Sequence, residues 1–73
     1  MQYTEKEMCE AIVNDAIKLG YSVSVFDGED FAIKRSNDAG AILAAMYSTG
    51  EDKLHFYRDD KMVGWVWLVY GND

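Results

Sequence analysis

Apolar residues near the start of the chain recur at the spacing of an α-helix. They form one stripe, which consists of Cys9, Ile12, Val13, Ala16 and Leu19. Thr4 and Glu7 have the spacing of a capping box, in which each side chain bonds the backbone N–H of the other residue. Gly20 suits the left-handed position that ends a helix. The pattern predicts a helix between Thr4 and Gly20, with Cys9 packed in the core rather than acting as a nucleophile.

The stretch "YSVSVFDGEDFAIKR" has the period of two β-strands. Apolar residues alternate with serines over residues 21–25, which is typical of a strand with one buried face. Asp27-Gly28 is a turn signal, and Phe31 and Ile33 then continue the buried face on the returning strand. The stretch therefore predicts a β-hairpin.

The second half of the chain repeats this order. Residues 38–48 favour a short helix, because polar residues at 36–38 can cap it and alanines are frequent, although a further strand also fits. The segments "KLHFYRDD" and "KMVGWVWLVYG" have the composition of two strands joined by a turn around Asp59 and Asp60. Since Asp-Asp is a weaker hairpin signal than Asp-Gly, the register of the last strand stays open.

Both halves thus follow the order helix, strand, turn, strand. Two such αββ units predict an α+β fold in which a four-stranded antiparallel sheet carries both helices on one face. At 73 residues the chain is expected to be a single domain, residues 1–73. A core of this size supports only marginal stability.

The predicted sheet carries apolar side chains on the face that the helices leave uncovered. From Met62 to Tyr70 every residue except Gly64 is apolar or aromatic, so either register leaves large apolar groups on that face. The expected interface residues are Phe26, His55, Tyr57, Trp65 and Trp67. Because contiguous apolar patches usually mark interaction sites, we expect a partner or a second copy to cover this face. The alternatives are a curved sheet that wraps its own aromatics and a segment beyond Asp73 in related chains.

Charge narrows the class of partner. Seven basic and 13 acidic residues give a net charge of −6 at pH 7, which argues against direct binding of nucleic acid because phosphates require Lys and Arg. The acidity either keeps a small protein soluble or forms a surface that docks on a basic partner. The candidate acidic surface consists of Asp27, Glu29, Asp30, Glu51, Asp52, Asp59 and Asp60.

Signatures of catalysis, metal binding or cofactor binding are missing from the sequence. His55 is the single histidine and has no nucleophile motif beside it, and "DGED" and "GEDK" lack the spacing of a calcium loop. There is no phosphate loop, dinucleotide fingerprint or zinc spacing. We therefore expect no enzymatic activity, no catalytic residue, no metal site and no cofactor. The N-terminus "MQYTEKEM" has no signal-peptide core and no segment is long enough to span a membrane, so a cytoplasmic location is expected.

The segments "YSVSVFDGEDFAIKRS", "ILAAMYSTGEDKLHFY" and "VGWVWLVYGND" together cover most of the chain. In this order they resemble a group of small, uncharacterised tailed-phage and prophage proteins with a terminal VYGND-like segment. The resemblance implies a phage or prophage origin, with the host cell cytoplasm as the location, and it implies no activity.

Two hypotheses of function follow from these observations. The first is a small acidic phage-type protein that acts by stoichiometric binding to a host protein, inhibiting a nucleic-acid-binding or defence protein through its acidic turns. The second is a structural module that self-associates, as a homodimer, through the aromatic face of the sheet. The first hypothesis requires the acidic residues, and the second requires Trp65 and Trp67.

Overall fold

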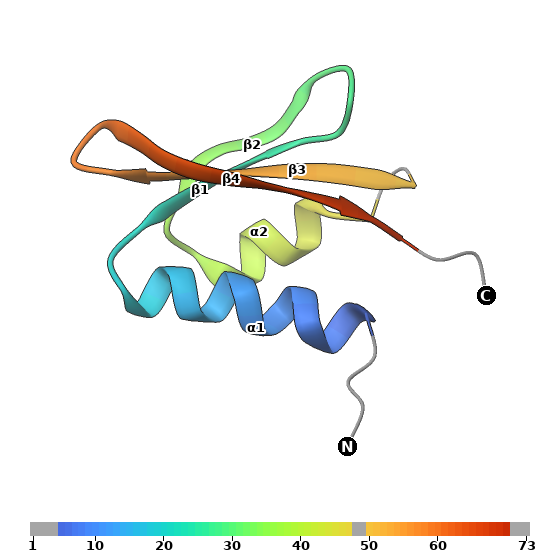
Figure 1. The fold of residues 1–73 in the computed structure, drawn as a ribbon, viewed down its shortest axis with the longest axis horizontal. Helices are drawn as coiled ribbons and strands as arrows, with labels where there is room; N and C mark the ends of the chain where they lie inside the picture. Colours follow the sequence, from blue (N-terminus) through green and yellow to red (C-terminus); the bar gives the residue numbers. More distant parts are fainter. Residues whose placement is uncertain (1–4, 48–49, 71–73) are drawn as a thin grey trace.

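A computed structural model describes residues 5–47 and 50–70 of the chain. Its elements, in order, are α1 (Glu5–Lys18), β1 (Ser22–Phe26), β2 (Phe31–Ser36), α2 (Ala39–Ala45), β3 (Glu51–Arg58) and β4 (Lys61–Val69). Both helices lie on the same side of one twisted sheet (Figure 1). The expected α+β class, its four antiparallel strands and its two αββ units are confirmed.

The sheet has the order β2-β1-β3-β4, and every neighbouring pair is antiparallel. Each αββ unit contributes one hairpin, and the two hairpins join through their first strands, β1 and β3. The order is therefore approximately twofold symmetric, with β2 and β4 as the two edges of the sheet.

Local signals explain where the two helices end and begin. After α1, Gly20 adopts a φ of 90° and donates to Ile17 O, while Tyr21 N donates to Ala16 O, which is the Schellman arrangement. Asp38 caps α2, because its carboxylate accepts from the N–H groups of Gly40 and Ala41 at 3.0 and 3.3 Å. The stretch 38–48 thus contains a helix, Ala39–Ala45, rather than a further strand. Thr4, the predicted cap of α1, lies outside the described residues.

The core lies between the helices and the inner face of the sheet. It is formed by buried side chains from both αββ units, namely Cys9, Val13, Ala16, Val23, Val25, Ile42, Met46 and Leu54. The prediction that Cys9 packs in the core is confirmed, because its side chain is 4% exposed.

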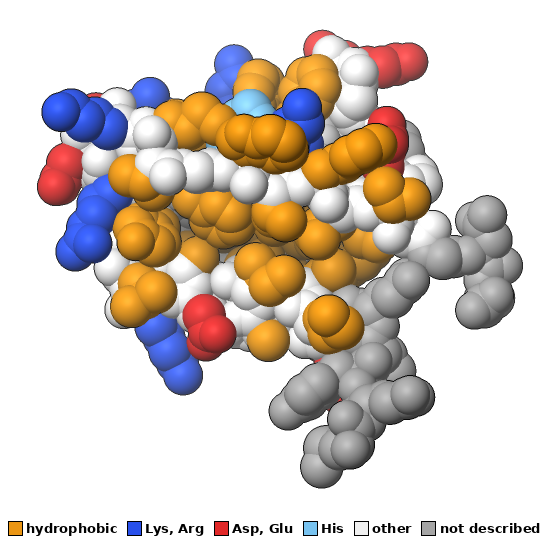
Figure 2. All heavy atoms as spheres, viewed as in Figure 1, with side chains coloured by type: hydrophobic (Ala, Val, Ile, Leu, Met, Phe, Trp, Pro, Cys, Tyr) orange, Lys and Arg blue, Asp and Glu red, His pale blue; other side chains and the backbone are white. Residues whose placement is uncertain are grey.

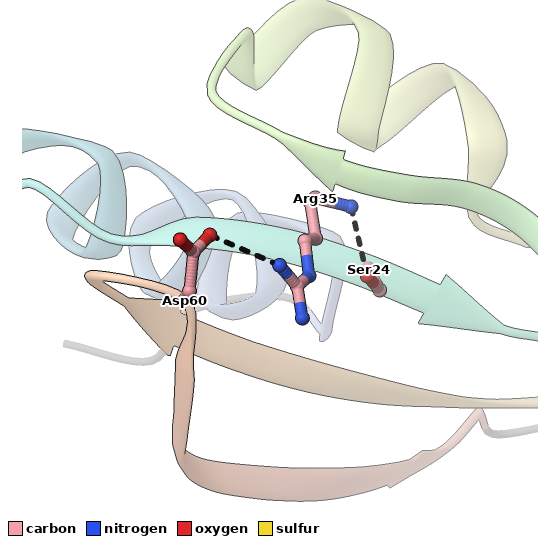
Figure 3. Close-up of polar contacts among 3 residues, drawn as sticks. All are labelled: Ser24, Arg35 and Asp60. Carbon is pink, nitrogen blue, oxygen red and sulfur yellow. Dashed lines mark hydrogen bonds and ion pairs between the residues drawn. The ribbon is translucent and has the colours of Figure 1, made fainter.

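The first hairpin differs from its prediction because β2 contains two bulges. Ile33 packs against the core as expected, but Phe31 pairs with Phe26 and lies on the other face of the sheet. The pairing shifts once between Val23 and Val25 and again after Val25, so strict alternation along β2 fails. At the first shift Arg35 has a φ of 45°, and its N–H donates to Ser24 Oγ at 2.8 Å (Figure 3).

The register of β4 is also set by a bulge. Phe56 pairs with Gly64 and Tyr57 pairs with Met62, which leaves Val63 as the extra residue. From Trp65 onward the odd-numbered side chains point away from the helices, and the even-numbered ones point toward them. The Asp59-Asp60 turn has positive φ at both residues, 51° and 67°, as a two-residue type I′ hairpin requires.

Candidate protein interaction surface

The sheet surface opposite the helices, here called the open face, is rich in large side chains. It carries Phe26, Phe31, Lys53, His55, Tyr57, Met62, Trp65, Trp67 and Val69. Trp65 and Trp67 remain 58% and 57% exposed, so the sheet does not wrap its own indoles. All five predicted interface residues lie on this face, and Phe31 is an additional member that strict alternation missed.

Rings on the open face contact one another across three strands. Phe31 lies 5.1 Å from Phe26 and 5.6 Å from His55 between ring centroids, the latter edge to face. His55 in turn pairs with Trp65 across the β3–β4 ladder. Burial, followed by the nearby Lys53 charge, lowers the pKa of His55, so the imidazole is neutral at pH 7. Aromatic rings from all four strands thus lie on the open face, and together they are here called the aromatic band.

Three cations lie above these rings. Lys34 Nζ is 5.6 Å from the Phe31 centroid, Lys53 Nζ is 5.0 Å from that of Trp65, and the Arg35 guanidinium carbon is 4.6 Å from that of Tyr57. Arg35 also forms an ion pair with Asp60 at 3.2 Å (Figure 3). Even with Lys53 above it, Trp65 stays 58% exposed, so these cations leave the indoles accessible.

A shallow hollow of about 320 Å³ opens on the open face, near the start of β3 and the end of β4. Its lining consists of Phe26, Gly28, Glu51, Asp52, Lys53, Trp65 and Trp67. Trp67 Nε1 donates to Glu51 Oε2 at 3.1 Å, which orients this indole as one wall of the hollow. The hollow therefore combines three aromatic side chains, Phe26, Trp65 and Trp67, with the Glu51 carboxylate.

The candidate acidic residues fall into three places instead of forming one surface. Asp27, Glu29 and Glu51 line a second hollow beside the first, and Asp30 belongs to the same turn; these four residues are here called the acidic corner. Asp59 and Asp60 lie in the β3–β4 turn at the opposite end of the sheet (Figure 1). Backbone N–H groups of Asp30 and Glu29 donate to Asp27 and lower its pKa, so this carboxylate stays ionised.

Asp52, the remaining acidic candidate, does not belong to the surface. Its side chain is 1% exposed and accepts from the N–H of Tyr47 and from the hydroxyl of Tyr70. Because strict alternation places Asp52 on the inner face, the β3 pattern carried the signal for this correction. Asp52 ties the end of β4 to the segment after α2 and has a structural role.

A second apolar surface lies on the helix side of the sheet, between α1 and β4. α1 packs mainly on α2 and β1, which leaves the inner side of β4 only partly covered. Two hollows of about 430 and 170 Å³ meet at Ile12 and form the α1–β4 groove, where hydrophobic side chains gather (Figure 2). Its lining includes Met8, Ile12, Asp15, Leu19, Phe56, Val63, Leu68 and Tyr70. Sequence patterning missed this groove because it depends on where α1 sits over the sheet.

The described residues contain no group of three or more His, Cys, Asp or Glu side chains that could hold a metal ion. Among the described helices, none is long and apolar enough to cross a membrane. Compared with known proteins, the chain matches no family model, no curated protein and no solved structure.

Proposed function

We propose that the protein is a binding module that takes a segment of another protein on its open face. The observation that carries this proposal is the exposed aromatic band that ends at the Trp65–Trp67 hollow. Exposed tryptophans in a contiguous apolar patch are the side chains that most often dominate binding free energy. The resemblance to phage proteins makes a host nucleic-acid-binding or defence protein the class of partner to test first.

The acidic corner defines the chemistry of the partner. Glu51 borders both the Trp65–Trp67 hollow and the hollow lined by Asp27 and Glu29. An apolar side chain that enters the first hollow therefore brings its neighbours beside the carboxylates of the acidic corner. The segment that fits has an apolar residue next to Lys or Arg. The charge pairing orients the segment on the surface and raises its association rate.

A protein partner fits this surface better than a single-stranded nucleic acid does. Aromatic rings with cations can stack bases, but the phosphates would then pass the acidic corner of a chain whose net charge is −6. The Trp67 indole is also hydrogen-bonded to the Glu51 carboxylate, and this carboxylate would repel a phosphate beside it.

Selection of random peptides displayed against the immobilised protein tests the proposal. Enriched peptides should place an apolar residue beside Lys or Arg, and the double variant Trp65→Ser, Trp67→Ser should weaken their binding by at least about tenfold. Ala44→Ser, an exposed position on α2, is the matched control and should leave binding unchanged.

Charge variants separate the acidic corner from the general acidity of the chain. Glu29→Gln with Glu51→Gln should weaken the selected peptides and reduce the salt dependence of binding. Asp59→Asn with Asp60→Asn removes the same charge at the other end of the sheet and should have a smaller effect. The proposal would be overturned if the double tryptophan variant bound the peptides as tightly as the unmodified chain. It would also be overturned if an oligothymidylate, and no peptide, bound the open face.

A further inference from the structure

The edge strand β4 has unpaired backbone groups beside the proposed binding face. Tyr70 N donates to Gly50 O, so the hydrogen-bonded pairs of the β3–β4 ladder continue through Leu68 and Val66. In an antiparallel ladder the residues between such pairs direct their N–H and C=O groups to the other side. The backbone groups of Trp65, Trp67 and Val69 therefore point away from β3, along an edge that no described strand covers.

The two edges of the sheet differ in how they are protected. β2 has two register shifts and places Lys34 and Arg35 in the strand, which are devices that block pairing with another strand. β4 is regular from Trp65 to Val69 and has no charged residue after Lys61. Of the two edges, β4 is thus the one open to strand addition.

Both sides of the β4 edge offer apolar surface to an added strand. On the open face lie Trp65, Trp67 and Val69, the last 63% exposed. On the helix side lies the α1–β4 groove, with Leu68 and Val63 in its lining. A strand beside β4 would direct alternate side chains to these two surfaces.

We propose that the partner segment binds as an extended strand that adds antiparallel to β4, with one set of alternate side chains toward the open face and the other set toward the α1–β4 groove. This inference rests on the proposed function and specifies its binding mode. Asp15 in the groove and Glu51 beside Val69 provide charge complementarity for a basic segment. A second copy is the poorer occupant, because each copy has a net charge of −6.

Amide hydrogen exchange of the 73-residue chain tests the strand addition residue by residue. In the free protein, the amides of Val66 and Leu68 should exchange slowly, and those of Trp65, Trp67 and Val69 should exchange fast. The probe is an octapeptide of alternating leucine and lysine. When the protein is saturated with this peptide, the exchange of the three edge amides should slow by at least about tenfold, since each amide gains a hydrogen bond.

Modified peptides supply the controls. Methylating the backbone nitrogens of one alternate set of residues should abolish binding, and methylating the other set should not, because only one set faces β4. An octapeptide of alternating leucine and glutamate should bind at least about tenfold more weakly. Loss of binding with both methylated sets, or with neither, would contradict an added strand.

The outcomes separate this inference from the proposed function. If the peptide binds and depends on Trp65 and Trp67 while the edge amides stay fast, the open face binds proteins without strand addition. If the edge amides slow but the tryptophan variant binds equally well, the open face is not the site. No binding of the leucine–lysine peptide overturns the inference, as does protection that appears without peptide and grows with protein concentration.

Discussion

At the residue scale, Asp52 is a carboxylate that the fold buries almost completely, with 1% of the residue exposed. Its Oδ2 accepts from Tyr47 N and from the Tyr70 hydroxyl, whereas its Oδ1 is buried without a hydrogen-bond partner. The Tyr47 and Tyr70 rings also contact each other, with centroids 4.9 Å apart. The end of β4 is therefore held by one carboxylate and two phenols.

Removing the Tyr70 hydroxyl should expose how much this contact stabilises the fold. In Tyr70→Phe the buried carboxylate keeps only the bond from Tyr47 N, and a lost hydrogen bond to a charged group costs about 1.5–3 kcal/mol. Tyr57→Phe, on the open face, is the control and should be close to neutral. Urea unfolding of both variants measures the free energies, and equal values would show that the Tyr70 bond is not stabilising.

The same two phenols predict how stability depends on alkaline pH. Burial raises the pKa of Tyr47 to about 12, and burial together with the bond to Asp52 raises the pKa of Tyr70 well above its ordinary value. Because the folded pKa values exceed the unfolded value near 10, the stabilisation is complete below pH 10 and is lost as pH rises beyond it. Melting temperatures from pH 8 to 12 should fall less steeply above pH 10 in Tyr70→Phe than in the unmodified chain.

At the element scale, the short helix α2 depends on its cap. It spans Ala39–Ala45, yet it places Ile42 in the core, with Met46 directly after it. A helix of this length is not stable alone, so its N-terminal bonds and its packing must hold it in place.

Asp38→Ala should therefore destabilise the whole domain. The change removes the acceptor for two helical N–H groups, at a cost of about 0.5–2 kcal/mol. Asn37→Ala, at the exposed neighbouring position, should cost much less. Thermal melts of the two variants measure this difference. Equal melting temperatures would mean that the Asp38 cap contributes nothing to stability.

The elements also show what the sequence could predict. The period of apolar residues predicted α1 and the two strands of the first hairpin, whereas the register of β4, which puts Trp65 and Trp67 on the open face, is set by the bulge at Val63 and stayed open in the sequence. Phe31 and Asp52 were misplaced for different reasons. Phe31 was moved to the open face by a bulge that no turn residue marks, whereas Asp52 was counted as surface on charge alone. The groove depends on the position of a helix over the sheet, which local patterns do not contain.

At the scale of the whole molecule, net charge opposes self-association while the exposed tryptophans favour it. A charge of −6 on each copy repels another copy at low ionic strength, and salt screens this repulsion within a Debye length of about 10 Å at 0.1 M.

Sedimentation should therefore report a monomer at low salt and increasing self-association as salt rises. Trp65→Ser combined with Trp67→Ser should stay monomeric throughout, because the apolar area that drives association is gone. A dimer that is fully formed at low salt would show that the −6 charge does not control assembly. It would also favour a second copy as the occupant of β4.

The uncharged edge of β4 has a further consequence for the unfolded chain. Residues 62–70 contain no charge and no proline, and they are rich in valine and aromatic residues, the composition that stacks into cross-β fibrils. The native fold buries only part of this segment. The chain therefore stays soluble only while the segment is folded in the sheet or covered by a bound partner strand. Val69→Lys, which places a charge opposite Glu51 in the ladder, should lengthen the lag before thioflavin-positive aggregates form on heating.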